Sequence, residues 1–105
     1  MIEIVDWLSD DEPATQEAFM RSYAPLIAAL PDDLKAVGTG LLENVRASSL
    51  TSIQTKLDSH THGHAWKATE NGVMVAYVDN WCLDSATAYV NNIFVLPEYR
   101  RQGEC

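Results

Sequence analysis

The beginning of the chain changes from an alternating pattern of polar and apolar residues to a helical one. Residues 3–8, Glu-Ile-Val-Asp-Trp-Leu, roughly alternate and predict a first strand. Residues 9–13, Ser-Asp-Asp-Glu-Pro, combine acidic groups with a proline suited to the first helical position, which is typical of a helix start. We expect Asp11 or Glu12 to accept hydrogen bonds from the free amides of that first turn.

Two apolar stripes at helical spacing follow. Pro25 lies inside the first stripe, and we expect a kink or a break near residue 24, because proline lacks a backbone donor and restricts the residue before it. The pattern restarts at Pro31, and residues 53–57 suit a short third helix. The first stripe is Phe19, Tyr23, Ile27 and Leu30; the second is Leu34, Val37, Leu41 and Val45.

From His64 onward the period becomes that of strands. Residues 64–69 predict a strand, Glu70-Asn71-Gly72 a hairpin turn, and residues 73–78 the return strand, because Asn and Gly readily take positive φ. A turn near residues 83–85 leads to a last strand at 87–95. The order is therefore strand, two helices and a three-stranded antiparallel meander, an α+β fold in a single domain spanning residues 1–105.

The chain is acidic, with seven basic against fifteen acidic side chains and a formal charge of -8. This balance disfavours nucleic acid and anionic membranes as partners. Residues 1–20 lack the basic region of a secretory signal, and no apolar run is long enough to span a membrane. We expect a cytoplasmic protein whose two cysteines, Cys82 and Cys105, are free thiols.

The histidines of His60-Thr61-His62-Gly63-His64 alternate in a way that would place three imidazoles on one side of an extended segment. No Asp, Glu or Cys stands beside them to complete a ligand set. We therefore favour a polar loop before a strand and predict no metal site.

The segment 93–103, Ile-Phe-Val-Leu-Pro-Glu-Tyr-Arg-Arg-Gln-Gly, has the chemistry of an anion-binding loop after a strand. The end of a strand offers backbone groups that an amide-rich arm can join as an added strand. Glycine allows close approach to a phosphate, and Arg100 and Arg101 add charge. The segment resembles the acyl-CoA binding motif of GNAT acyltransferases, a strand ending in Val-x-Pro, an aromatic, then R/Q-x-x-G-x-G/A. With the order of elements, the resemblance covers residues 1–103.

The resemblance implies a GNAT-like half-domain, the N-terminal portion of the fold with its second half absent. It implies acyl-CoA dependent N-acetyltransferase chemistry, with acetyl-CoA as cofactor and a small-molecule or protein amine as acceptor. Phe94 and Val95 would then meet the pantetheine arm through their backbone, and Arg100, Arg101, Gln102 and Gly103 would meet the pyrophosphate.

The sequence also departs from the family pattern. Glu104 and Cys105 replace an apolar residue and a Gly or Ala, and the sequence ends there, without the helix that completes the pyrophosphate site. Family members often carry a glutamate base on the fourth strand, where this chain has Tyr-Val-Asn-Asn at residues 89–92, and asparagine cannot take a proton at neutral pH. Three nearby carboxylates would substitute only if the fold brings one of them to the site: Asp79, Asp84 and Glu98. No catalytic residue is assigned, and the lone chain is expected to be incomplete or inactive.

The last predicted strand suggests a second function. Without further strands, residues 87–95 form an open edge that is apolar on both faces, and such an edge pairs with another chain. We expect a homodimer, or a partner protein, that covers this strand. The alternative to an enzyme is thus a non-catalytic, GNAT-derived interaction protein with an acidic surface; a small phage-encoded inhibitor of host defence fits the size and charge. A fragment of a longer gene product is a third interpretation.

Overall fold

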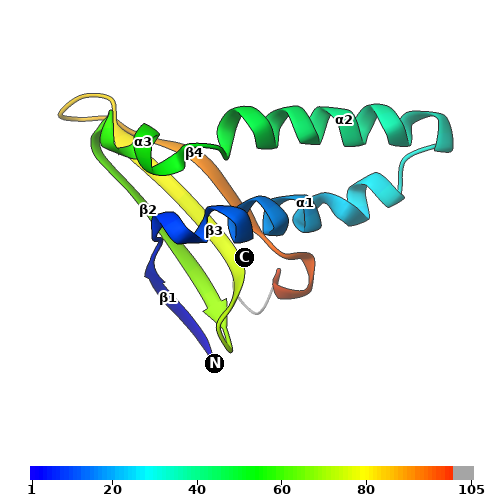
Figure 1. Cartoon of the computed structure of the whole chain (residues 1–105), viewed down its shortest axis with the longest axis horizontal. Coiled ribbons are helices and arrows are strands. Elements are labelled where there is room, and N and C mark those ends of the chain that lie inside the picture. Colours follow the sequence, from blue (N-terminus) through cyan, green and yellow to red (C-terminus); the bar gives the residue numbers. More distant parts are fainter. Residues whose placement is uncertain (101–105) are drawn as a thin grey trace.

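The computed structural model describes residues 1–100 and shows a four-stranded sheet with helices packed over one face (Figure 1). The sheet order is β1-β2-β3-β4, and every pair of neighbours is antiparallel. The predicted α+β architecture and its meander are confirmed, and a short α3 precedes β2. The elements are β1 Ile2–Asp6, α1 Glu12–Ala28, α2 Asp32–Ser49, α3 Ile53–Asp58, β2 Thr61–Glu70, β3 Val73–Cys82 and β4 Ala88–Val95, with single 3-10 turns at Ser9–Asp11 and Pro97–Tyr99.

The predicted hairpin between β2 and β3 is present. Glu70 pairs with Val73, and the two loop residues Asn71 and Gly72 have φ of 53° and 80°. Positive φ at both loop positions is the conformation whose twist matches that of the flanking strands. This tight turn fixes the register of the sheet, because a slip by one residue would turn every side chain to the other face.

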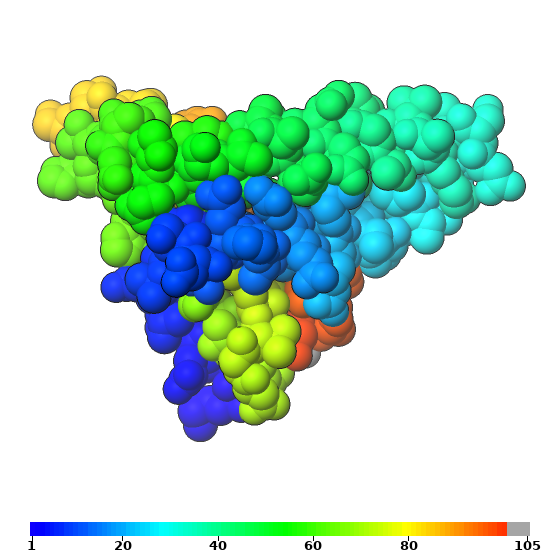
Figure 2. All heavy atoms as spheres, in the orientation of Figure 1, coloured from blue at the N-terminus to red at the C-terminus, as the bar shows by residue number. Residues whose placement is uncertain are grey.

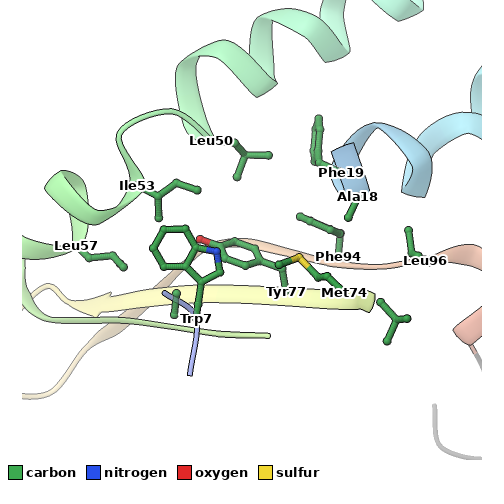
Figure 3. Packing of buried hydrophobic residues seen from close by; sticks show 12 residues of the cluster. Trp7, Ala18, Phe19, Leu50, Ile53, Leu57, Met74, Tyr77, Phe94 and Leu96 are labelled. Carbon is green, nitrogen blue, oxygen red and sulfur yellow. The ribbon is translucent and has the colours of Figure 1, made fainter. Parts of the chain in front are cut away.

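The core lies between the sheet and the helices that cover it (Figure 3). Phe19 of α1 meets Phe94 of β4 edge to face, with ring centroids 5.8 Å apart, and Tyr77 of β3 lies 5.6 Å from the same Phe94 ring. Pairs of this geometry add to the stabilisation that comes from burial itself. The buried apolar residues are Trp7, Ala18, Phe19, Leu50, Ile53, Leu57, Ala65, Met74, Val75, Tyr77, Phe94 and Leu96.

Of the kink or break expected near residue 24 of the first helix, the break is wrong. α1 continues through Pro25 to Ala28, and the amide of Ala29 still donates to the carbonyl of Pro25 at 3.1 Å. Pro25 lies one turn from the helix end, so its missing donor removes one bond from a helix that its buried face holds against the sheet. Tertiary packing outweighs the local penalty here.

α2 packs along α1, and the two helices form a hairpin that runs past the sheet (Figure 1, Figure 2). The contact uses Gly38, where a Cβ would lie 2.7 Å from Cδ1 of Leu30 and 2.9 Å from Cδ1 of Ile27. The absence of a side chain at Gly38 therefore allows the close approach. The predicted apolar stripe of α2 faces solvent instead, with side chains between 40% and 62% exposed: Leu34, Val37, Leu41 and Val45.

Candidate functional site

β4 is an edge strand whose outer side is unpaired within residues 1–100. The amide of Leu96 donates to the carbonyl of Val75 at 2.9 Å, which fixes the direction of the backbone groups at this end of β4. Because that direction alternates along an antiparallel strand, Phe94 also bonds toward β3, opposite Tyr77. The N–H and C=O groups of Ile93 and Val95 therefore point to the open side.

A bulge interrupts the pairing of β4 with β3. Asp79 lies opposite Asn92 and Asn80 lies opposite Val90, so Asn91 has no partner residue on β3. A bulge of this kind bends a strand and redirects the groups beside it. The open stretch at Ile93 begins two residues after this irregularity.

The carboxyl group of Asp79 lies at the bulge and is almost fully buried, with 2% of the residue exposed. Its Oδ1 accepts the backbone N–H of Asn92 at 2.9 Å, and its Oδ2 accepts a short hydrogen bond from the hydroxyl of Tyr77. Burial raises the pKa of Asp79, and the hydrogen bonds from Tyr77 and Asn92 only partly offset this. Burial and the neighbouring Asp79 also raise the pKa of Tyr77.

The other two carboxylates considered from the sequence lie elsewhere. Asp84, in the loop between β3 and β4, accepts the amide of Ala86 at 2.8 Å. Glu98, in the turn after β4, forms an ion pair with Arg21 of α1 at 3.6 Å. Of the three carboxylates, Asp79 is therefore the one that the fold places against β4.

One buried donor lies beside this acid. Nδ2 of Asn92 is buried and has no hydrogen-bond partner among the described residues. Buried polar atoms without partners are uncommon, because leaving one unsatisfied is unfavourable. The Asn92 side chain nevertheless interacts with the Asp79 carboxyl, whose pKa it helps to lower, so it belongs to the same polar cluster.

Arg100 closes the end of the open edge. Its Nε donates to the carbonyl of Val95 at 2.9 Å, and its Nη2 donates to the carbonyl of Ser22 on α1 at 2.7 Å. The turn after β4 is thereby tied to α1. Among the predicted cofactor-binding residues, Phe94, Val95 and Arg100 come together here, although the Phe94 side chain lies in the core. Arg101, Gln102 and Gly103 lie outside the described residues, and the binding roles of all six stay predictions.

The face of the sheet away from the helices is apolar and exposed. Its side chains alternate in sequence with Tyr77 and Phe94, which point into the core. They surround a shallow hollow of about 150 Å³, lined mainly by Ile4, Trp66, Ala68, Ala76, Val78 and Ile93. This face and the free edge of β4 adjoin at Ile93, which is 67% exposed.

The histidine segment was expected to be a loop before a strand, but β2 already begins at Thr61, and the segment makes contacts within the protein. The His60 ring stacks on Trp81 with centroids 4.0 Å apart, and Nε2 of His64 lies 2.9 Å from Oδ1 of Asp6. Residues 1–100 contain no group of three His, Cys, Asp or Glu side chains placed to hold a metal ion. Cys82 is a half-buried free thiol, and Cys105 lies outside the described part of the chain.

The strand of the site is predictable from the sequence, whereas its bulge and its buried acid are not. Neither the bulge at Asn91 nor the bond from Asn92 to Asp79 was predicted. A signal was present: Asp79 stands two residues after Tyr77, and in a strand such residues share a face. A carboxylate on the buried face of a strand needs hydrogen-bond partners, so it indicates an organised polar cluster at that position.

Comparison with solved structures identifies the fold. Eight chains of solved structures match, and several acetyltransferases are among them. PaiA N-acetyltransferase from Thermoplasma acidophilum, in complex with coenzyme A, has 13% identity and a TM-score of 0.71, over 97% of this chain and 63% of that one. The ribosomal-protein-S18-alanine N-acetyltransferase from Escherichia coli has 24% identity and a TM-score of 0.56, over 98% and 51%. A GNAT family acetyltransferase from Brucella melitensis, in complex with acetyl-CoA, has 15% identity and a TM-score of 0.52, over 99% and 59%.

No family model and no curated protein sequence matches the chain. The structural likeness, at 24% identity or below for these three proteins, shows the GNAT acetyltransferase fold. The chain spans between 51% and 63% of the length of these structures. No helix among residues 1–100 is long and apolar enough to cross a membrane.

Proposed function

We propose that the chain is the acyl-CoA-binding portion of a GNAT-type N-acyltransferase, with acetyl-CoA as its ligand and an amine as the acyl acceptor. The observation that carries this proposal is the open edge of β4, where the backbone groups of Ile93 and Val95 point outward beside a bulge. Two proteins of the same fold were crystallised with coenzyme A or acetyl-CoA. The pantetheine arm of such a ligand contains amides, which pair with a free strand edge as an added strand does.

The described residues fit the pantetheine end of the ligand. The edge of β4 offers outward N–H and C=O groups at Ile93 and an N–H at Val95. The carbonyl of Val95 is taken by Arg100. Two of the five guanidinium donors of Arg100 bond backbone carbonyls, so its contact with the pyrophosphate, together with residues 101–103, remains a proposal.

The chemistry of acyl transfer limits what the lone chain is proposed to do. Transfer from a thioester to an amine requires a polarised carbonyl, loss of a proton from the amine and protonation of the thiolate. Asn91 and Asn92 cannot take a proton at neutral pH, and the carboxyl of Asp79 is buried. We therefore propose binding of acyl-CoA by this chain, with turnover slow or absent unless further residues complete the site.

Isothermal titration of acetyl-CoA into the full chain tests the proposal. We expect saturable heat at one ligand per chain, reduced by Ile93→Pro, which removes an outward N–H of β4. Ile93→Ala is the matched control, because it removes the same side chain and keeps the N–H. Folded protein that gives no heat would contradict the proposal, as would equal loss of binding in both variants.

A non-catalytic interaction protein is the second candidate. It is favoured by the exposed apolar face, on which Ile4 is 76% and Ile93 67% exposed, next to an unpaired edge. Under this proposal a second copy of the chain, or a partner protein, covers the 87–95 strand, and inhibition of a host defence protein by a phage-encoded chain is one example. Absence of heat with acetyl-CoA, together with a dimer in light scattering or a stoichiometric protein partner, would favour this candidate.

A further inference from the structure

The bulge of β4 brings a side chain into the hydrogen bonding of the strand's backbone. A bulge disrupts the regular ladder, and an amide buried there needs an acceptor from another source. At Asn92 this acceptor is Oδ1 of Asp79, at 2.9 Å. A side chain therefore anchors the backbone at the irregularity.

Asp79 is itself held from the core. Its second oxygen accepts the hydroxyl of Tyr77, whose ring packs 6.2 Å from Trp7 and 5.6 Å from Phe94. Tyr77 is 2% exposed, so it has little freedom to move. The contacts run continuously from the core rings through Tyr77 and Asp79 to the backbone of Asn92.

If stability were the only requirement, an aspartate would be an unfavourable residue at position 79. Burying a carboxyl group opposes folding unless its oxygens are bonded, and an apolar side chain would suit the surrounding core. Asp79 has acceptors for two donors at once, and both donors are present. The other titratable groups around this pair are few: Glu12 at the start of α1 is the charged side chain that acts on Tyr77, and it is bonded to the amides of Ser52 and Ile53.

We propose that Asp79 is a positioning residue: it fixes the bulge of β4 and thereby the direction in which Ile93 and Val95 present their outward backbone groups. The identity of the ligand that meets this edge rests on the proposed function. The effect of Asp79 on the edge does not, because it follows from the bond to Asn92 alone.

Amide hydrogen exchange and amide chemical shifts, measured by NMR on the full chain, test the proposal. In Asp79→Ala we expect exchange at Asn92 to rise at least about tenfold, because a hydrogen bond to an ionisable acceptor is lost, and the signals of Ile93 and Val95 to move. Asp79→Asn keeps one acceptor and can donate to Tyr77, so it should restore slow exchange at Asn92. Asp33→Ala, which removes an exposed carboxylate on α2, is the control and should leave β4 unchanged.

Tyr77→Phe keeps the proposal testable if Asp79→Ala does not fold. It removes the hydroxyl that holds Oδ2 and keeps the ring, so exchange at Asn92 should rise, although less than in Asp79→Ala. Rates at Asn92 within about twofold of wild type in folded Asp79→Ala or Tyr77→Phe, with unmoved signals of Ile93 and Val95, would overturn the proposal.

Acetyl-CoA titration separates this inference from the proposed function. If wild type binds acetyl-CoA, Asp79→Asn should bind with an affinity close to wild type and Tyr77→Phe more weakly. If wild type does not bind, the proposed function fails, and the amide measurements still decide whether Asp79 positions β4. If the signals of Ile93 and Val95 move in Tyr77→Phe but its affinity for acetyl-CoA is unchanged, the direction of these backbone groups does not determine ligand binding.

Discussion

The carboxylate of Glu12, at the start of α1, accepts a 2.9 Å hydrogen bond from the backbone amide of Ile53, at the start of α3. Its second oxygen accepts the amide of Ser52 at 3.1 Å. Ser52 has a φ of 53°, so the chain turns sharply before α3 begins. Because the first amides of a helix have no partner within it, Glu12 supplies acceptors across 41 residues of sequence.

Glu12→Ala should lower the free energy of unfolding by about 1–2 kcal/mol, because it leaves two amides without their acceptor. Glu12→Gln keeps one acceptor oxygen and should lose less. Urea unfolding followed by circular dichroism measures both. Glu17→Ala, on the exposed side of α1, is the control and should stay within about 0.5 kcal/mol of wild type; an equal loss in Glu12→Ala and Glu17→Ala would contradict the role of Glu12.

A buried side-chain hydrogen bond joins the loop after β1 to α1. Nε1 of Trp7 donates to Oγ1 of Thr15 at 2.8 Å, and Thr15 is fully buried. Thr15→Val has nearly the same shape and leaves the indole N–H without an acceptor, so it should destabilise the fold by about 1–3 kcal/mol. Thermal unfolding measures this, with Thr39→Val on exposed α2 as the control. A Thr15→Val variant as stable as wild type would mean that the indole finds another acceptor.

The pH dependence of stability should carry the signature of Asp79. Burial raises its folded-state pKa above the ordinary value near 3.8, so the folded protein holds this proton more tightly than the unfolded chain. The contribution of Asp79 to stability is therefore largest below the unfolded pKa and falls as pH rises through the folded one. Asp11 has the opposite slope: burial raises its pKa, but the hydrogen bonds from Lys67 and the Leu8 amide outweigh this and lower it.

The comparison of wild type with Asp79→Asn isolates this dependence, because Asp11 is common to both proteins. Relative to Asp79→Asn, wild type should lose unfolding free energy as pH rises above about 4, measured by urea unfolding at several pH values. Parallel curves for the two proteins would show that Asp79 has the same pKa in the folded and unfolded states.

Self-association through β4 gives a further prediction. An exposed strand edge pairs with a second chain through its outward N–H groups, and proline at such a position removes a donor without disturbing the inner ladder. Ile93→Pro should therefore shift a dimer toward monomer in sedimentation velocity, whereas Ile93→Ala should retain more of it. A clean monomer of wild type at micromolar concentration would exclude the homodimer.

Local chemistry explains which parts of the fold were predictable. Asn71 and Gly72 specify the hairpin because few other residues take positive φ at both positions. Pro25 was misleading, since its local penalty was judged without the packing of α1 on the sheet. Glu12 was expected to accept amides of its own first helical turn, but it bonds the amides of Ser52 and Ile53 at the start of α3, far away in sequence.

In the candidate site, too, local features are predictable from the sequence and contacts between distant segments are not. The strand at 87–95 follows from the sequence, because alternation is a local signal. The bulge at Asn91 depends on the register with β3, and no periodicity within β4 reveals it. The hydrogen bond from the Asn92 amide to Asp79 depends on that same register, so it cannot be predicted without the pairing of β3 with β4.

Binding of acetyl-CoA at the edge of β4 is tested by titrating the isotope-labelled chain with this ligand and following the backbone amide signals in NMR. We expect saturable shifts centred on Ile93, Val95 and Arg100, with little change along α2. Shifts absent at millimolar ligand, or centred away from β4, would contradict the proposal that this edge binds an acyl-CoA.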